Sequence, residues 1–322
     1  MNPIYDLAII GGGPAGVAAG VYASRKRLKT LFITKDWGGQ SLVSPEIQNW
    51  IGTVKVSGLE LADMLKNHLT AYAKGIVDIK EGGEVAKIEK IPLSKGGQTH
   101  SDATGVVFSV QTETETYRAK TVLITAGSHR RKLAAPGAEK FDGKGVTYCA
   151  SCDGPLFADL DVAVVGGGNA GFETAAQLLA YCKSVTLLQR GDEFKADPVT
   201  IKRVLANPKM HAILSAEILE VKGDKTVAGL VYKTKDSNEK KELAVQGVFV
   251  EIGSVPSTGF IEGLVWVDRW GQIKADPRTQ RTNVLGVWAA GDVTDGLYHQ
   301  NNIAAGDAVK ALEDIYIYLH AK

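Results

Sequence analysis

The sequence predicts an α/β protein built from two similar units in which strands and helices alternate. Two glycine-rich turns of the same form, at residues 11–16 and 166–171, each follow an apolar stretch and precede a helical one. They stand 155 residues apart (166 minus 11), and an internal duplication explains this repeat better than chance does. A chain of 322 residues with 36 glycines suits two such domains with many tight turns.

Composition argues against several classes of protein. The net charge of +1 creates no long-range field that would recruit nucleic acid or a membrane. The sequence has no run of about 18 apolar residues, and no basic segment followed by a cleavable apolar one. Three cysteines, of which two form one close pair, are not a disulfide scaffold. We therefore expect a cytoplasmic protein that neither spans a membrane nor is secreted.

The first glycine-rich turn lies between a buried strand at residues 5–10 and a helix at residues 17–24, and a second strand follows at 30–33. This order of elements around G-x-G-x-x-G is typical of a dinucleotide-binding turn, the alternative being a plain glycine-rich turn. The acid that would bind a ribose is missing from the end of the second strand, where Thr34 and Lys35 stand.

Each glycine of this turn is expected to have its own role. Gly11 permits the tight bend, Gly13 lets the backbone approach a pyrophosphate, and Gly16 lets helix and strand pack closely. The pyrophosphate would lie on the helix N-terminus. Because the second turn repeats the pattern, the sequence predicts two bound dinucleotides rather than one.

The other elements follow from periodicity and turn residues. In the first part of the chain we expect an amphipathic helix at 58–74, β structure at 76–117 with a polar loop at 94–105, a buried strand at 121–125 and a basic linker at 128–145. In the second part we expect strands at 161–165 and 185–188 around a helix at 172–182, a β-meander at 212–246, a returning strand at 247–253, a strand with an acid at its tip at 286–292 and a long helix at 301–319.

Cys149 and Cys152 are separated by two residues and followed directly by Asp153. In a reducing cytosol such a C-x-x-C is catalytic or metal-binding. A zinc site needs two more ligands, usually another close pair, but Cys182 stands alone on a predicted helix and the histidines are unpaired. We therefore interpret the pair as a redox-active dithiol and Cys182 as a small buried apolar residue.

Asp153 is expected to act on protons. A neighbouring carboxylate disfavours a thiolate, so this residue does not make the cysteines more acidic. Its better role is to donate a proton to the departing thiolate and take it back, as general acid and base. The plain alternative is a turn residue before Gly154.

The sequence resembles the low-molecular-weight thioredoxin reductases and the flavoprotein component of bacterial alkyl hydroperoxide reductase. The resemblance runs nearly from end to end and is carried by residues 8–16, 38–40, 46–50, 149–154, 166–171 and 289–293. It implies two Rossmann-like three-layer dinucleotide-binding domains and a homodimer. An NAD(P)H-binding domain at 131–246, which carries the C-x-x-C, would be inserted into a discontinuous FAD-binding domain at 1–130 and 247–322.

The resemblance also implies which residues bind the cofactors. FAD would be held by Gly11, Gly13, Pro14, Ala15, Gly16, Gly39, Gln40, Asn49, Ala126, Gly127, Gly291, Asp292, Gln300 and Asn301. The nicotinamide nucleotide, NADPH or NADH, would be held by Gly166, Gly168, Asn169, Ala170, Gly171, Glu173, Gln189, Arg190, Lys195 and Gly253. Cys152 would face the flavin, Cys149 would attack the disulfide of a partner, and no metal is implied.

The nicotinamide and the disulfide belong to the same inserted domain, yet both must reach one flavin. In the family, that domain rotates on two crossings between the domains. Here the resemblance places these crossings near residues 130 and 247, and the rotation is a hypothesis for this chain.

The choice between NADPH and NADH is expected at the end of the second strand of the second unit. A ribose 2′-OH favours an acid there, whereas a 2′-phosphate favours arginine. Gln189 is followed by Arg190 and, further on, Lys195, which favours NADPH. Thioredoxin reductases that prefer NADPH carry two adjacent arginines, so Gly191 departs from their pattern, and Gly171 is closer to the alkyl hydroperoxide reductase flavoprotein.

The leading hypothesis is an FAD-dependent reductase that moves electrons from NADPH through FAD and the Cys149–Cys152 disulfide to thioredoxin or another thioredoxin-fold protein. The alternative is an NADH-dependent flavoprotein, similar to that of alkyl hydroperoxide reductase, with a glutaredoxin-like or peroxiredoxin-linked partner. Because the chain starts at the FAD strand, we expect the partner to be a separate protein. Arg130, Arg131 and Lys132 are candidates for guiding an acidic partner, although a solvated surface is the simpler interpretation.

Three other interpretations fit less well. Oxidases that form small-molecule disulfides lack an intact second glycine turn. Ferredoxin-linked reductases of the same fold lack either the C-x-x-C or that turn. A flavin-binding protein without enzymatic activity would not need the cysteine pair.

Overall fold

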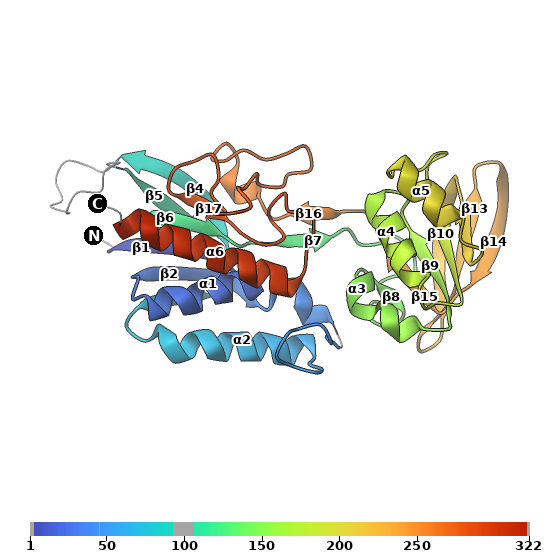
Figure 1. The fold of residues 1–322 in the computed structure, drawn as a ribbon, viewed down its shortest axis with the longest axis horizontal. Coiled ribbons are helices and arrows are strands. Elements are labelled where there is room, and N and C mark those ends of the chain that lie inside the picture. The colour runs from blue at the N-terminus through green and yellow to red at the C-terminus, as the bar shows by residue number, and fades with distance from the viewer. Residues whose placement is uncertain (1–2, 45, 93–105, 321–322) are drawn as a thin grey trace. The chain divides into compact units, whose positions relative to one another are not determined.

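The structure is a computed structural model that describes residues 3–44, 46–92 and 106–320 (Figure 1). The polar loop expected at 94–105 lies outside the described residues. The described chain divides into two compact units: the first takes in residues 3–44, 50–129 and 255–320, and the second takes in residues 46–49 and 130–254. None of the described helices is long and apolar enough to cross a bilayer.

The first unit is built on a seven-stranded sheet with the order β3-β2-β1-β6-β5-β4, in which β17 pairs with β6. Its strands are β1 (Ile4–Gly12), β2 (Thr30–Trp37), β3 (Val77–Glu81), β4 (Val85–Pro92), β5 (Val106–Thr112), β6 (Thr116–Ile124) and β17 (Val287–Ala289). Strands β1, β2, β3, β6 and β17 are parallel, whereas β4, β5 and β6 form an antiparallel meander. The carboxyl ends of the parallel strands therefore meet at one edge.

Helices α1 (Pro14–Arg25), α2 (Gly58–Ala73) and α6 (Asn301–His320) lie on one side of this sheet (Figure 1). The start of α2 is fixed by a capping box, because Ser57 accepts from the Glu60 N–H and the Glu60 carboxylate accepts from the Ser57 N–H. Alternation along β1 gives the sheet two apolar faces. Ala8 and Ile10 join a buried cluster that includes residues 261–293 of the covering segment.

The second unit has three layers. Its centre is a parallel sheet with the order β11-β10-β9-β15-β8, formed by β8 (Val146–Thr147), β9 (Asp161–Val165), β10 (Ser184–Leu188), β11 (Met210–Ile213) and β15 (Gly247–Val250). One side carries the helices α3 (Ala150–Asp153), α4 (Asn169–Leu178) and α5 (Pro198–Leu205). The other side carries an antiparallel sheet of β12 (Ala216–Gly223), β13 (Val227–Thr234) and β14 (Ser237–Ala244).

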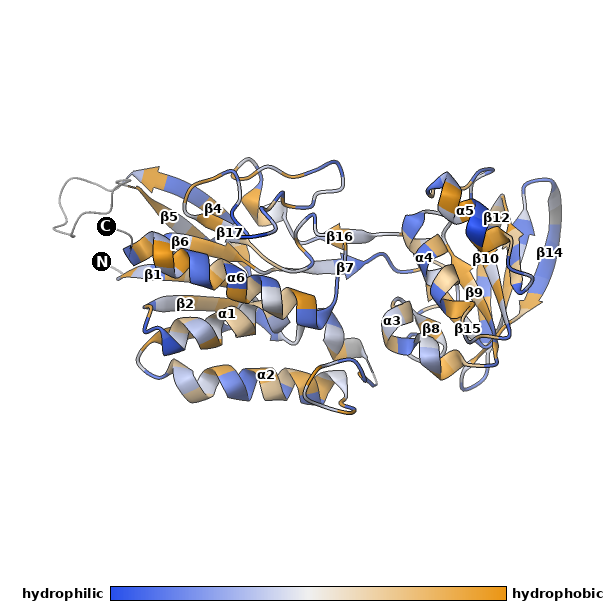
Figure 2. Cartoon of the chain, viewed as in Figure 1, coloured by the Kyte–Doolittle hydropathy of each residue, from blue (hydrophilic) through white to orange (hydrophobic). Residues whose placement is uncertain are grey.

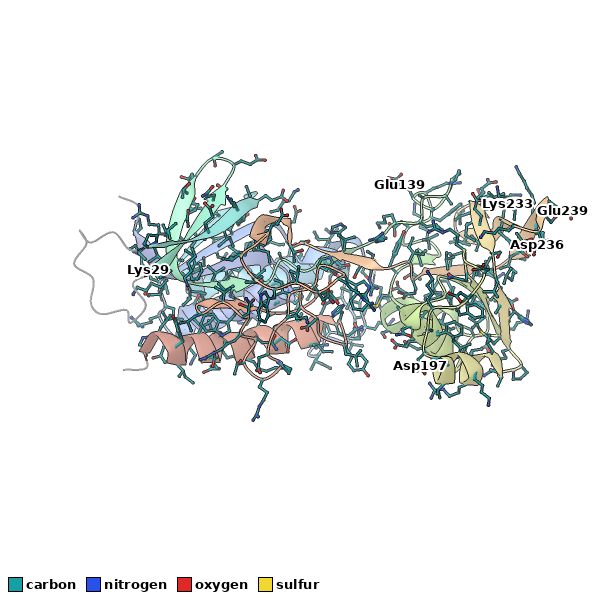
Figure 3. All side chains as sticks on the ribbon, turned by 90° about the horizontal axis from the view of Figure 1, so that it is seen from above. Lys29, Glu139, Asp197, Lys233, Asp236 and Glu239 are labelled. Atoms are coloured by element: carbon teal, nitrogen blue, oxygen red, sulfur yellow. A yellow bond between two sulfur atoms is a disulfide. The ribbon has the colours of Figure 1, made fainter. Side chains whose placement is uncertain are left out.

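The layers are held together by alternate residues of the central strands. Val162 and Val164 pack against α4 and α5, while Ala163 and Val165 pack against the antiparallel sheet. The hydropathy colouring of Figure 2 shows this pattern, with the most apolar residues concentrated on the inner strands. The charged tip of the β13–β14 hairpin points outward, as the labels of Lys233, Asp236 and Glu239 show in Figure 3.

Short elements complete the chain. They are η1 (Gly39–Val43), β7 (Ser128–Arg130), η2 (Gly154–Phe157), β16 (Ser254–Pro256) and η3 (Gly259–Ile261). Strands β7 and β16 pair with each other and contain the two crossings of the chain between its units.

Two sequence-based boundaries were wrong. Residues from 247 onward were expected in the first domain, but β15 pairs with β9 and β8 inside the second sheet, and the unit ends at Ser254. The physical reason is that the apolar run 247–250 is a fully buried central strand. The meander was expected from residue 212, but 210–213 forms the parallel edge strand β11. The helices expected at 58–74 and 301–319 are confirmed as α2 and α6.

Candidate active site and dinucleotide sites

A cavity of about 480 Å³ lies in the first unit, where the carboxyl ends of β1, β2 and β6 meet. This edge is where open α/β sheets bind ligands. Most of the residues predicted to hold FAD line the cavity: Gly11, Gly13, Pro14, Ala15, Gly39, Gln40, Ala126, Gly127, Asp292 and Asn301.

The first glycine-rich turn fits a dinucleotide pyrophosphate. Gly11 has φ +118°, and a Cβ on it would lie 2.3 Å from the carbonyl oxygen of Thr125. A Cβ on Gly16 would lie 1.8 Å from the carbonyl oxygen of Gly11. A Cβ on Gly13 would meet nothing closer than the Cα of Gly39 at 3.9 Å. The outer glycines thus serve the fold itself, whereas the middle one leaves open the space that a phosphate needs at the N-terminus of α1.

Polar side chains from distant parts of the chain meet at this cavity. The amide of Gln40 donates to Asp292 Oδ2 at 3.2 Å and to Ser128 Oγ at 3.3 Å. The amide of Asn301, at the start of α6, donates to Ser41 Oγ at 2.9 Å. The structure therefore brings Gln40, Asp292 and Asn301 together as the sequence predicted.

Four predicted FAD residues do not line the cavity. Gly16 packs against the turn, and Gly291 has φ +77° with its Cβ position 3.1 Å from the Cβ of Ala304. Gln300 precedes α6 outside the lining, and Asn49 belongs to the short segment that groups with the second unit.

Sequence reasoning missed one wall of the cavity. Thr34, Lys35 and Asp36 at the end of β2, and the segment 83–85 before β4, all line it. Lys35 Nζ lies 3.0 Å from Glu84 Oε2, which joins the two walls. The signal in the sequence was the Gly82-Gly83 pair that follows β3, where small residues leave the backbone accessible.

In the second unit, Cys149 and Cys152 form a disulfide, with their Cα atoms 5.3 Å apart. The pair encloses the start of α3, because Cys149 is its N-cap and its Sγ accepts from the Cys152 N–H at 3.2 Å. Both cysteines are half-buried. The predicted dithiol is therefore a closed ring on one short helix, with Asp153 at the end of that helix.

The carboxyl of Asp153 is largely enclosed. Its Oδ2 accepts a hydrogen bond from the Thr147 hydroxyl, and its Oδ1 is buried without a partner among the described residues. Burial raises the pKa of Asp153, although the bond from Thr147 acts to lower it. A carboxyl that keeps its proton to a higher pH than usual suits a general acid.

The remaining cysteine has a different environment. Cys182 is fully buried, and burial raises its pKa to about 11. A thiol that stays protonated and inaccessible is inert. Among the described residues, no three His, Cys, Asp or Glu side chains cluster as metal ligands would.

Helix α4 supports the dithiol ring. Gln177 donates to the Ala150 carbonyl at 3.3 Å and accepts from the Ser151 hydroxyl at 3.2 Å. A Cβ on Gly154 would lie 2.1 Å from the hydroxyl of Tyr181, which follows the helix. The C-x-x-C is thus fixed to the same helix that the second glycine-rich turn begins.

That second turn repeats the geometry of the first. Gly166 has φ +126°, and its Cβ would lie 2.2 Å from the carbonyl oxygen of Glu251. A Cβ on Gly171 would lie 1.9 Å from the carbonyl oxygen of Gly166, whereas one on Gly168 would meet nothing within 4 Å. The turn therefore also fits a dinucleotide at the N-terminus of α4.

The residues beyond this turn lie where the ribose of a nucleotide would be read. Gln189 Oε1 accepts from the Gly167 N–H at 3.1 Å, and its amide donates to the Glu193 carbonyl at 3.1 Å. Arg190 and Lys195 are exposed, and the Lys195 N–H donates to the Gly167 carbonyl at 2.8 Å. These predicted residues are brought together at one edge of the turn.

The other predicted nucleotide residues surround the same turn. Asn169 Oδ1 accepts from the backbone N–H of Asp197, the N-cap of α5 that Figure 3 labels, at 2.8 Å. Ala170 and Glu173 lie on the exposed side of α4. Gly253 has φ +101° and accepts from the Arg131 N–H at 3.0 Å.

A buried glutamate near this turn was not predicted. Glu251 accepts from the Thr174 hydroxyl at 2.9 Å and pairs with Arg130 at 3.4 Å. Burial raises the pKa of Glu251, more than the charge of Arg130 lowers it. Lys132 lies 4.4 Å from the centre of the Tyr148 ring. The basic stretch is thus partly engaged in contacts within its own unit.

Two dinucleotide turns and a disulfide beside a carboxyl define a nucleotide-dependent disulfide oxidoreductase. The family model described as "Pyridine nucleotide-disulphide oxidoreductase" matches residues 5–308. The chain belongs to this family. Its cofactors are accordingly FAD and a nicotinamide nucleotide, and the two turns supply the fitting sites.

Similar proteins carry several names. The chain is 38% identical over 318 residues to a component protein of the alkyl hydroperoxide reductase of Escherichia coli, covering 98% of this chain and 58% of that protein. It is 36% identical over 315 residues to a Bacillus subtilis protein named NADH dehydrogenase, again covering 98% and 58%. The chain thus spans under two thirds of the length of these relatives.

Among solved structures, the thioredoxin reductase of Streptococcus pyogenes has a TM-score of 0.88 and 34% identity, covering 100% of both chains. The thioredoxin reductase of Giardia duodenalis has a TM-score of 0.88 and 30% identity, covering 99% of both. The predicted fold class of two Rossmann-like domains is confirmed.

Proposed function

We propose that this protein is a thioredoxin-disulfide reductase, which transfers electrons from NADPH to a disulfide of thioredoxin or another thioredoxin-fold protein. The observation that carries the proposal is the Cys149–Cys152 ring, which lies beside a carboxyl and on the helix that the second dinucleotide turn begins. A protein that only binds flavin has no use for this arrangement. We also propose a homodimer, which light scattering would test.

When bound, FAD accepts two electrons from the nicotinamide and passes them on to the disulfide. The residues of the chain then do the sulfur chemistry. The disulfide between Cys149 and Cys152 opens, and Asp153 supplies a proton to one of the sulfurs. The Cys152 N–H that points at Cys149 Sγ stabilises a thiolate there, because a hydrogen bond to the charged form favours it. Cys149 is therefore the better nucleophile toward the partner's disulfide.

NADPH is proposed as the donor from the charges at the end of β10. Arg190 is exposed at that position, and Lys195 follows on the strand that bridges to the turn. The side chain of Gln189 turns back to the glycine-rich turn and has no carboxylate to offer a ribose 2′-OH. A 2′-phosphate would find two basic side chains here.

NADH is the second candidate, and one observation favours it. Asp192 and Glu193 are exposed beside Arg190 and reduce the net positive charge at this edge. The relatives named for alkyl hydroperoxide reductase and for NADH dehydrogenase point in the same direction. In this version the acceptor is a thioredoxin-fold domain or protein linked to a peroxiredoxin.

An anaerobic titration would test the proposal. The purified protein is titrated with NADPH and, separately, with NADH, while the flavin absorbance is followed, and oxidised thioredoxin is then added. We expect NADPH to bleach the flavin at the lower concentration and thioredoxin to restore it. Bleaching without recovery would contradict thioredoxin as acceptor, and preferential bleaching by NADH would favour the second candidate. Arg203→Ala, an exposed arginine on α5, is the matched control for Arg190→Ala.

A further inference from the structure

Thr147 is a buried polar residue directly before the dithiol. It lies in β8, where it pairs in register with Phe249 of the central strand β15, so its backbone is fixed by the sheet. Its side chain is only 6% exposed. The position and orientation of its hydroxyl are therefore set by the fold and not by solvent.

The hydroxyl of Thr147 has two partners in the dithiol segment. It accepts from the Cys149 N–H at 3.4 Å and donates to Asp153 Oδ2. A hydroxyl has one proton, and here that proton points at Oδ2. The other carboxyl oxygen, Oδ1, is buried without a partner among the described residues. The two oxygens of Asp153 are thus not equivalent.

We propose that Thr147 is a positioning residue for the dithiol chemistry, whose hydroxyl holds Asp153 Oδ2 so that Oδ1 is the oxygen that takes and releases the proton. This inference rests on the proposed function, because it assigns a task within the same disulfide exchange. Without the hydroxyl, the carboxyl would be free to rotate, and either oxygen would bear the proton.

The surroundings of Asp153 leave Thr147 as its main polar influence. Burial raises the pKa of this carboxyl and the Thr147 hydroxyl lowers it, while no charged side chain among the described residues shifts it. From α4 and the segment after it, Gln177 faces the ring and Tyr181 faces Gly154. Tyr181 stays protonated, because burial raises its pKa as well.

The step that Thr147 serves is balanced as follows. Two electrons break the Cys149–Cys152 bond, one sulfur takes the proton of Asp153 and the other remains a thiolate. The Cys149 thiolate then forms a bond to one sulfur of the partner and breaks the partner's disulfide. Asp153 takes the proton back from Cys152, whose thiolate closes the ring again and releases the partner as a dithiol.

The test uses the full chain with its dithiol reduced chemically by a phosphine and freed from reductant. Its reaction with the disulfide reagent DTNB is followed from pH 5 to pH 9.5, which requires neither nucleotide nor protein partner. The variants are Thr147→Val, which keeps the shape without the hydroxyl, and Thr147→Ser, which keeps the hydroxyl. Asp153→Asn and the double variant complete a cycle that isolates the coupling between the two residues.

Loss of a hydrogen bond to a carboxylate raises its pKa, so the acid limb of the Thr147→Val profile should move up by about one pH unit. The rate on that limb should fall roughly 10-fold and match the wild type at the alkaline plateau. Thr147→Ser should follow the wild type, and Thr147→Val should add nothing to Asp153→Asn.

Uniform slowing of Thr147→Val at every pH, or an equal shift in the Asp153→Asn background, would overturn the proposal. If Thr147→Val does not fold, Thr147→Ala is measured against Thr147→Ser in the same way. A wild-type profile for Asp153→Asn would instead refute the acid–base role of Asp153 on which the inference rests. Failure to reduce thioredoxin in the anaerobic titration would leave this result unaffected, so the two failures are distinguishable.

Discussion

The paired substitutions Gly13→Ala and Gly16→Ala should separate binding from stability at the first dinucleotide turn. A Cβ on Gly16 would lie 1.8 Å from the Gly11 carbonyl oxygen, whereas real Cβ atoms stay beyond 3.0 Å. The backbone must therefore move by at least 1.2 Å (3.0 minus 1.8). Overpacking of this kind costs about 1–3 kcal/mol, of which up to ~1 kcal/mol is offset by the better helix propensity of alanine.

The net loss for Gly16→Ala is thus about 1–2 kcal/mol, or roughly 3–6 °C in the melting temperature of the FAD-free unit. Gly13→Ala meets no such contact, because its nearest neighbour would be 3.9 Å away, and its φ of −76° is open to any residue. We expect the FAD-free stability of Gly13→Ala to stay within about 0.5 kcal/mol of the wild type. Its added methyl group fills the space of the pyrophosphate, so the FAD affinity should fall at least ~10-fold.

The assay has two parts. The flavin content of the purified variants and a titration of FAD-free protein with FAD measure binding. Thermal unfolding without FAD measures stability, since bound FAD would itself raise the melting temperature. Wild-type FAD affinity in Gly13→Ala would refute the role of the middle glycine, and an unchanged melting temperature in Gly16→Ala would refute the packing argument.

Three further outcomes are expected. Cys149→Ser should leave the bleaching of the flavin by nucleotide within about twofold, but reduce disulfide turnover roughly 1,000-fold or more, because serine cannot form the exchanging disulfide; equal turnover would exclude this cysteine. Arg190→Ala should lower the NADPH to NADH preference about 10-fold while Arg203→Ala leaves it unchanged, measured from initial rates; an unchanged ratio would mean that Arg190 does not set it. Glu251 has a raised pKa in the folded state, so it stabilises the protein at low pH and this contribution is lost as pH rises through its folded pKa. Glu251→Gln should therefore gain about 1 kcal/mol relative to the wild type at pH 8 and nothing at pH 4, measured by denaturant unfolding; a constant difference would contradict the linkage.

Local signals predicted the fold well where one element decides its own structure. The two glycine-rich turns, α2 with its capping box and the long helix α6 were evident from periodicity and caps. The returning strand was harder to assign, because residues 247–250 are apolar throughout and suit the centre of either sheet. Only the pairing of β15 with β9 decides the unit to which it belongs.

The site was predictable to the same extent. Residues next to a recognisable turn, such as Gln40 and Asp292, were placed at the cavity that holds them. Thr147, Gln177 and Glu251 were not, since each acts through a partner distant in sequence or hidden in an unremarkable strand or helix. A hydroxyl that binds a carboxyl six positions later leaves no periodic signal.

The two turns also show where nucleotide choice must be made. Gly11 and Gly166 have nearly the same φ, and the third glycine of each turn meets the carbonyl of the first at 1.8 and 1.9 Å. Their middle glycines are both open to a ligand. Backbone that is so alike cannot distinguish FAD from a nicotinamide nucleotide. Discrimination therefore falls to side chains one strand further on, which are Thr34 and Lys35 after the first turn and Gln189 and Arg190 after the second.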